Sequence, residues 1–263
     1  MKRKPGPVGK GLPVLIAGLI LGGVFMLGPW AQAGDKADKA EEAEARTQRK
    51  QAALDLRMRW TFDKDQPGRI PAGFSALTVG DGPASAWRVE PDTEVLTRSK
   101  LVVQGKPCIS DSCFQLLIAD TLVYDYVEIA FRLRPRHNGA AGIGGVVLGY
   151  EDPMNFYAVL ADFSEDRLSV VRVQNGVKTV MGSGPVTPKK SPWHHIRVQR
   201  NTIISKVFIE TYFDARLAVS VEENTLRPGQ VGLVTQGDVP IEFDNLDVMR
   251  IYSQQPLSSP AAY

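Results

Sequence analysis

The sequence predicts an all-β body, a sandwich or a barrel, over most of its 263 residues. Between Trp60 and Ile251, short runs of alternating apolar and polar residues follow one another, separated by Gly, Pro, Asn and Asp. No convincing amphipathic helix interrupts the series. A hydrophobic content of 43% and a charged content of 23% are typical of a globular chain, and they exclude a disordered or collagen-like one.

The first 33 residues are typical of an export signal. They contain a basic start, an uncharged run over 12–30 and the sequence Ala31-Gln32-Ala33. This order predicts a secretory signal peptide that is cleaved after Ala33. An uncleaved membrane-anchor helix is the alternative, because the 19 residues of the run can just span a bilayer. Both interpretations place the rest of the chain in the periplasm or outside the cell. The chain would contact the membrane only through residues 12–30, and only if this segment is not cleaved off.

The charge gives no support for a nucleic-acid partner. The whole chain has 31 Lys and Arg residues against 29 Asp and Glu residues. Four of the basic residues belong to the signal segment, so the remainder has 27 basic and 29 acidic side chains and a net formal charge of −2. Binding to a phosphate backbone needs a concentrated positive face.

A charged, partly helical spacer is expected over 34–58. This segment is rich in Ala, Glu, Lys, Arg and Gln, which are good helix formers, but it has almost no apolar stripe before Leu54. A helix without such a stripe is not held by packing. At the other end of the chain, residues 253–263 are expected to form a disordered tail.

Twelve strands are expected in the body. Their ranges are 100–103, 113–118, 124–134, 144–150, 156–162, 168–174, 177–182, 194–200, 205–212, 217–222, 229–235 and 241–251. The pair Asn175-Gly176 selects a tight hairpin between two of them. A second short turn is expected at Asp214-Ala215-Arg216.

The alternation also assigns faces. One face of the strand over 124–134 is apolar, and the polar residues Glu128, Arg132 and Arg134 share the opposite face. His194 alternates with Ile196 and Val198, which predicts a histidine buried in the core. The adjacent His195 faces the other way, so these two histidines cannot chelate one metal ion.

A series of turn and core motifs carries a resemblance to a known fold. They are Trp60-Thr61-Phe62-Asp63, Ile70-Pro71-Ala72-Gly73-Phe74, Trp87-Arg88-Val89, Gly144-Gly145-Val146-Val147-Leu148, Asn155-Phe156-Tyr157, Arg172-Val173-Gln174-Asn175-Gly176, Trp193-His194, Gly229-Gln230-Val231-Gly232-Leu233 and Phe243-Asp244-Asn245. Over about 60–250 the chain resembles the concanavalin A-like lectin/glucanase jelly rolls. It is most similar to secreted bacterial domains described as keto-disaccharide hydrolase-like or family 16 glycoside hydrolase-like.

The resemblance implies a two-sheet, jelly-roll-like sandwich over 59–252 with a concave face that can hold a saccharide. Many members of this superfamily bind carbohydrate and some cleave it, so the fold does not choose between the two. We expect an exported carbohydrate-associated domain that binds glycan without strong catalysis. The alternatives are a glycoside hydrolase and a structural or partner-binding protein of the cell envelope.

The candidate catalytic residues are three carboxyls near the end of the body. Family 16 glucanases carry Glu-x-Asp-x-x-Glu on one strand, and the nearest match is Glu242-Phe243-Asp244-Asn245-Leu246-Asp247. Glu242 would be the nucleophile, Asp244 its electrostatic helper and Asp247 the acid. The third position is Asp instead of Glu, and the segment is expected to be the last strand. An outward acidic edge that discourages edge pairing is therefore the favoured interpretation.

Four other residues are candidates for saccharide binding. Tyr157 lies on the face of its strand opposite Phe156, and together with Glu128, Arg132 and Arg172 it could line a concave polar sheet. The alternative interpretation is a set of ordinary solvated cross-strand pairs.

The two cysteines, Cys108 and Cys113, predict a structural disulfide in an exported chain. Their spacing differs from the Cys-x-x-Cys of metal and redox sites. No cofactor is expected. A calcium site using Asp162, Asp238 and Asp244 is conceivable in such a sandwich, but no contiguous loop motif supports it.

Overall fold

The computed structural model describes residues 57–93, 99–106, 108–120, 123–136, 142–203, 205–223, 225 and 228–251. The expected signal or anchor, nearly all of the expected spacer and the expected tail lie outside these residues. The described part contains strands and no helix, which confirms the all-β prediction. No helix that could cross a membrane is found in this part of the chain.

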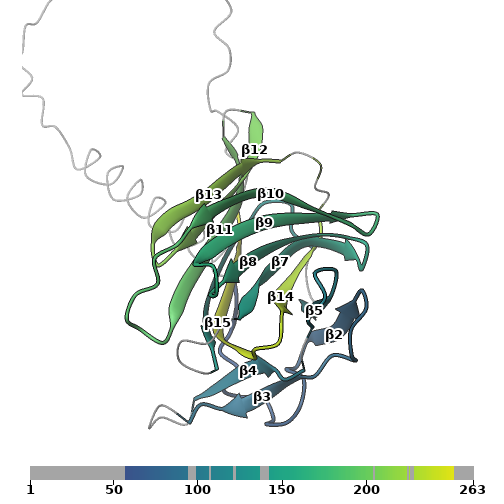
Figure 1. Ribbon diagram of the computed structural model, residues 1–263, viewed down its shortest axis with the longest axis vertical. Helices are drawn as coiled ribbons and strands as arrows, with labels where there is room; N and C mark the ends of the chain where they lie inside the picture. The colour runs from purple at the N-terminus through teal and green to yellow at the C-terminus, as the bar shows by residue number, and fades with distance from the viewer. Residues whose placement is uncertain are drawn as a thin grey trace, which may run out of the picture. The chain divides into compact units, whose positions relative to one another are not determined.

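The strands form two antiparallel sheets (Figure 1). Sheet A has the order β13-β12-β11-β6-β15-β4-β3, with β1 paired to β15, and its strands are β1 (Arg57–Trp60), β3 (Trp87–Pro91), β4 (Lys100–Gln104), β6 (Val127–Pro135), β11 (His194–Ile203), β12 (Lys206–Phe213), β13 (Arg216–Glu222) and β15 (Ile241–Arg250). Sheet B has the order β10-β9-β8-β7-β14-β5-β2, and its strands are β2 (Phe74–Val79), β5 (Phe114–Ala119), β7 (Ile143–Asp152), β8 (Asn155–Asp162), β9 (Arg167–Gln174), β10 (Val177–Pro185) and β14 (Gln230–Gln236).

The main core lies between the inner faces of the two sheets. Phe131 and Phe243 from sheet A and Leu233 from sheet B are among its fully buried side chains. As expected, the apolar face of β6 points inward and Glu128, Arg132 and Arg134 point outward. The two-sheet sandwich is therefore confirmed.

All twelve expected strands are present, but three strands that the sequence analysis did not expect precede them. These are β1, β2 and β3. In β2, only Phe74 is fully buried and the following five residues are partly or largely exposed. A strand at the edge of a sheet buries little surface, so its sequence shows a weak alternation.

The two expected turns are both tight two-residue loops. Asn175 and Gly176 have φ values of 51° and 78°, and they connect β9 to β10. Asp214 and Ala215, at 46° and 70°, connect β12 to β13. Positive φ at both central residues is the type I′ geometry that matches the twist of a hairpin.

A β-bulge at Asn245 fixes the orientation of the acidic side chains on β15. The pairing of β15 with β6 shifts between Asp244 and Asp247, and Asn245 has a φ of 52°. The Asp244 carboxylate stabilises this backbone by accepting a hydrogen bond from the Asn245 N–H at 2.6 Å. The extra residue keeps Asp244 and Asp247 on the outer face, together with Glu242.

Sheet B is curved so that its outer face, which points away from sheet A, is concave. The Phe114 and Phe156 rings, on β5 and β8, meet there with centroids 5.5 Å apart. In a flat sheet these strands, three spacings apart, would be separated by about 14 Å. The strands β7 to β10 appear as a curved layer in Figure 1. The outer face holds a second apolar cluster, whose fully buried members include Leu116, Val147 and Val234.

The cysteines form the expected disulfide between Cys108 and Cys113, which closes a loop directly before β5. The Gln236 side-chain amide donates to the Asp111 and Cys113 carbonyls at 3.1 and 2.8 Å. Lys178, from the edge strand β10, donates to the same Asp111 carbonyl at 3.0 Å. These bonds fasten the loop to two strands of sheet B.

Candidate functional site

A pocket of about 270 Å³ opens at the end of sheet B where the β7–β8 and β9–β10 hairpins turn. Its lining is mainly polar and includes Glu151, Asn155, Tyr157, Arg172, Gln174, Asn175 and Thr225. The pocket is smaller and more polar than a usual small-molecule site, but its convergent polar groups make it the candidate binding site in the described part of the chain.

Side-chain hydrogen bonds hold the rim of this pocket. The Asp152 carboxylate accepts from the backbone N–H of Met154 at 2.6 Å and from the Asn155 side chain at 3.0 Å. These bonds lower the pKa of Asp152, the one from Asn155 most. The Asn155 side-chain oxygen in turn accepts from the backbone N–H of Asn175 at 3.0 Å. Asn155 therefore joins the two hairpins at the pocket.

Three ionisable side chains meet at the inner side of the pocket. Tyr157 and Arg172 are directly opposite each other on β8 and β9. Arg172 lies 3.6 Å from the carboxylate of Glu223, whose side chain is only 2% exposed, and 3.3 Å from the Thr225 hydroxyl. The backbone N–H of Thr225 donates to Glu223 at 2.6 Å.

Their protonation states follow from these contacts. Burial alone would raise the pKa of Glu223, but hydrogen bonds from Thr225 and the charge of Arg172 lower it overall. Burial and the neighbouring Glu223 carboxylate raise the pKa of Tyr157. The Tyr157 hydroxyl therefore keeps its proton, and it has no hydrogen-bond partner of suitable geometry among the described residues. Because Glu223 balances Arg172, the pocket is equipped to bind hydroxyl groups and has no uncompensated cation at its base.

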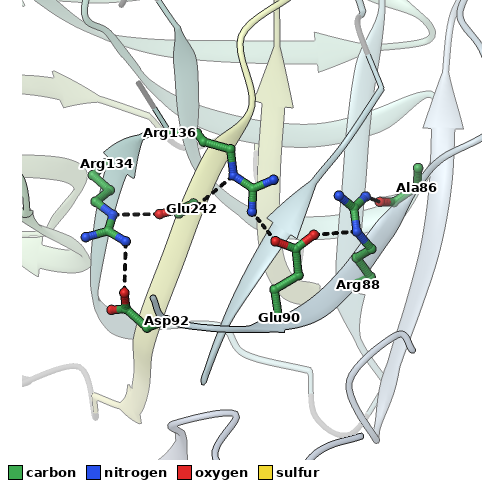
Figure 2. A network of polar contacts seen from close by, with 7 residues as sticks. All are labelled: Ala86, Arg88, Glu90, Asp92, Arg134, Arg136 and Glu242. Atoms are coloured by element: carbon green, nitrogen blue, oxygen red, sulfur yellow. Dashed lines mark hydrogen bonds and ion pairs between the residues drawn. The ribbon is translucent and has the colours of Figure 1, made fainter. Parts of the chain in front are cut away.

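The candidate catalytic carboxyls lie elsewhere, on the outer face of sheet A. The expectation that they form an acidic edge is wrong, because β15 pairs with β6 on one side and with β4 and β1 on the other. Glu242 accepts from Arg134 at 2.6 Å and from Arg136 at 2.8 Å, one bond to each oxygen. Figure 2 shows that the ion-pair network around Glu242 extends through Arg136 to Glu90 and from there to Arg88. Burial would raise the pKa of Glu90, but the two arginines lower it overall.

The other two carboxyls are engaged in the same way. Asp247 accepts from Arg57 through both oxygens, one of them at 2.7 Å. Asp244 accepts from Arg132 and from the backbone of Asn245. Every oxygen of the three carboxyls thus has a donor, which is the arrangement of structural ion pairs. A glycosidase instead needs one carboxyl that can attack and one that can give up a proton.

The four candidate binding residues do not come together. Glu128 and Arg132 are on the outer face of sheet A, where Glu128 accepts from Arg197 at 3.3 Å and from Gln199. Tyr157 and Arg172 are on sheet B. Tyr157 does not share an open polar surface with Glu128 and Arg132, because its side chain packs in the main core and is 3% exposed, and it reaches only the inner side of the pocket beside Arg172. The curved outer face of sheet B is lined by apolar residues such as Phe156 instead.

The expectation of a core histidine is confirmed. His194 is 5% exposed, stacks on the Phe213 ring at 5.0 Å and places Nδ1 3.0 Å from the Asp214 carboxylate. Of the proposed calcium ligands, Asp162 accepts bonds within its own turn, from Ser164 among others, and Asp244 pairs with Arg132. Among the described residues, no group of three His, Cys, Asp or Glu side chains is placed to hold a metal ion.

The residues predicted from the sequence did not include Asn155 and Thr225, which line the pocket, or Glu223, which pairs with Arg172. Glu223 and Thr225 belong to the link between β13 and β14, and only the folded chain brings that link to Arg172. The hydrogen bond between Asn155 and Asn175 could in part be anticipated from the sequence. The Asn175-Gly176 turn was predicted, and the β7–β8 hairpin before it also contains an asparagine.

The sequence matches no protein-family model and no curated protein. Two solved structures nevertheless share the architecture. The carbohydrate-binding module CBM66 from Bacillus subtilis is 15% identical, with 67% of this chain and 95% of that chain covered and a TM-score of 0.52. The Bacillus licheniformis β-glucanase is 10% identical, with 74% and 98% covered and a TM-score of 0.51. The chain has the concanavalin A-like lectin/glucanase fold. At these identities the likeness concerns the fold alone, and this fold serves both binding and cleavage.

Proposed function

We propose that this chain is an exported glycan-binding domain that holds a neutral saccharide in the pocket beside Arg172 and does not hydrolyse it. The observation that carries the proposal is the pocket itself. Its lining includes Arg172, which is paired with the buried Glu223, and the polar residues Asn155, Asn175 and Thr225, whose types supply the donors and acceptors that suit the hydroxyl groups of a sugar.

The fold supports a role with carbohydrate without deciding which role. One of the similar structures is a carbohydrate-binding module and another is a β-glucanase. The ion pairs of Glu242, Asp244 and Asp247 favour binding over cleavage, because each carboxyl is already committed to an arginine. Export is inferred from the first 33 residues, and the Cys108–Cys113 disulfide agrees with an oxidising compartment.

Calorimetric titration of the full-length protein with neutral oligosaccharides of glucose, galactose, mannose and fructose tests the proposal. We expect binding of at least one sugar, and Arg172→Gln should weaken it about tenfold, since one charge-assisted hydrogen bond is lost. Arg167→Gln is the matched control, because Arg167 is an exposed residue of the same strand outside the pocket.

Two outcomes would overturn the proposal. No heat of binding with any of the sugars would remove the saccharide function. Equal affinity of the wild type and Arg172→Gln would remove the pocket as its site. Incubation of the bound sugar with the protein should release no new reducing ends, and their release would favour the hydrolase alternative.

A further inference from the structure

On a second surface, the outer face of sheet A, three arginines lie over nearly buried carboxylates. The side chains of Arg57 and Arg59 are 47% and 58% exposed, whereas that of their partner Asp247 is 11% exposed. Arg132 is 42% exposed above Asp244, which is 12% exposed. In these pairs the carboxylate lies beneath and the guanidinium group faces the solvent.

Four arginines surround one small residue; three of them are more than 40% exposed and the fourth, Arg197, is 32% exposed. Ala130 on β6 is directly opposite Asp247 on β15 and Arg197 on β11. Arg59 is paired with Asp247 on the far side, and Arg132 lies two residues along β6 on the same face. Neighbouring strands are about 4.8 Å apart, so these positions form a row of arginines across the sheet. The short side chain of Ala130 leaves a depression in the middle of this row.

These guanidinium groups are already held in place. Arg197 lies over the Tyr212 ring at 3.8 Å and donates to Glu128, and Arg132 lies over the Trp193 ring at 5.3 Å and donates to Asp244. A guanidinium has five N–H donors, so most of them stay available after these bonds. Fixing the side chains beforehand reduces the entropy lost when an anion binds.

The chemistry of this face points to singly charged carboxylate or sulfate groups repeated along a polymer. Arginine binds carboxylates and sulfates through paired N–H donors. The carboxylates beneath the arginines offset much of their charge, so the face lacks the concentrated charge that duplex DNA, with one phosphate per about 1.7 Å of its axis, needs. The Trp193 and Tyr212 rings are covered by arginines, so they are not bare platforms on which a neutral sugar could stack.

We propose that Arg57, Arg59, Arg132 and Arg197 form a binding surface for an acidic polysaccharide, separate from the pocket on sheet B. The carboxylate or sulfate groups of the chain would accept hydrogen bonds from successive guanidinium groups across the sheet. The surface would retain the domain on an acidic glycan while the pocket engages a neutral sugar.

The test compares the full-length protein with Arg59→Gln/Arg197→Gln. Both substitutions leave the carboxylates partnered, because Asp247 keeps Arg57 and Glu128 keeps Gln199. The matched control is Arg69→Gln/Arg167→Gln, which removes the same charge from two exposed arginines elsewhere. Thermal unfolding of each variant confirms that it folds.

Binding to polygalacturonate is measured at low and high ionic strength, with neutral dextran for comparison. We expect the wild type and the control to bind polygalacturonate and not dextran, the affinity to fall at high salt, and the double variant to bind at least about tenfold more weakly. No binding by the wild type, or equal binding by the double variant, would overturn the proposal. So would tighter binding to single-stranded DNA or to phosphatidylglycerol vesicles than to polygalacturonate. The Arg172→Gln variant should bind polygalacturonate normally, which separates this test from that of the pocket.

Discussion

Lys178 and Asp111 are joined across sheet B: the lysine ammonium donates to the aspartate backbone carbonyl at 3.0 Å, although four strands separate β10 from β5 in the sheet. The same ammonium lies 5.4 Å from the centre of the Phe114 ring. Because Asp111 belongs to the loop closed by the Cys108–Cys113 disulfide, this bond ties the edge of sheet B to a covalently constrained segment.

Replacing this lysine should weaken the fold measurably. Lys178→Ala removes the hydrogen bond and the contact with Phe114, and we expect it to lower the free energy of unfolding by about 1 kcal/mol in urea titrations. Lys206→Ala is the control, because its pair with Glu222 is exposed and should contribute about 0.3 kcal/mol. Equal losses in the two variants would contradict a specific role for Lys178.

Removing the disulfide should cost more. For a loop of this length, Cys108→Ser/Cys113→Ser is expected to lose about 2 kcal/mol of stability, mainly because the unfolded chain gains freedom. Wild-type protein unfolded in the presence of a reductant should show the same loss. A midpoint that does not respond to the reductant would show that the bridge contributes no stability.

The apolar cluster on the outer face of sheet B should behave as a true core. Phe156 is 1% exposed and contacts Phe114, so Phe156→Ala is expected to lower the free energy of unfolding by about 3 kcal/mol. Val180→Ala, which changes a side chain that is 57% exposed, should stay within about 0.5 kcal/mol. Denaturant midpoints measure both, and a small loss for Phe156→Ala would mean that this face is not tightly packed.

The lowered pKa of Asp214 predicts that the stability of the protein depends on pH. Burial alone would raise the pKa of its carboxyl, but hydrogen bonds from the His195 backbone and from His194 lower it below the ordinary 3.8. A carboxyl with a lowered pKa in the folded state stabilises the protein above its unfolded pKa, and this contribution is lost as the pH falls below about 4. Asp214→Asn should therefore be less stable than the wild type at pH 7.

Urea titrations at several pH values measure this difference, which should shrink as the pH falls below the unfolded pKa. A difference that is the same at pH 7 and at pH 3 would indicate that the asparagine disturbs packing and that the charge of Asp214 has no part in the loss.

Glu242→Gln separates a structural from a catalytic role on β15. The glutamine cannot balance Arg134 and Arg136, and the side chains of Arg134 and Glu242 are nearly buried, so we expect a loss of about 3 kcal/mol in unfolding experiments. Calorimetry on the folded variant should show unchanged saccharide affinity at the pocket. A stable variant that has lost a glycan-cleaving activity of the wild type would contradict this expectation.

Much of the sandwich could be predicted because its signal is local. Alternation with a period of two identified twelve strands and the outward face of β6, and two short turn sequences identified their hairpins. Alternation could not tell which side of β8 faces the main core. Phe156 and Tyr157 face opposite sides and both are buried, because sheet B has an apolar cluster on each face.

The site depended on contacts that no local pattern contains. Arg172 was recognised as a candidate, but its partner Glu223 lies in the link between β13 and β14. The carboxyls of β15 matched a catalytic spacing in sequence, whereas their pairing with arginines of β1 and β6 depends on the order of the strands in sheet A.

The curl of sheet B leaves β5 enclosed on every side. All six of its residues are buried, its two neighbours β14 and β2 take up its ladder bonds, and apolar clusters cover both of its faces. Exposing its backbone to solvent requires separating it from β14 and β2 and opening the apolar clusters on both faces. Its amide protons should therefore be the last to exchange for deuterium, and their rate reports global unfolding of the sandwich.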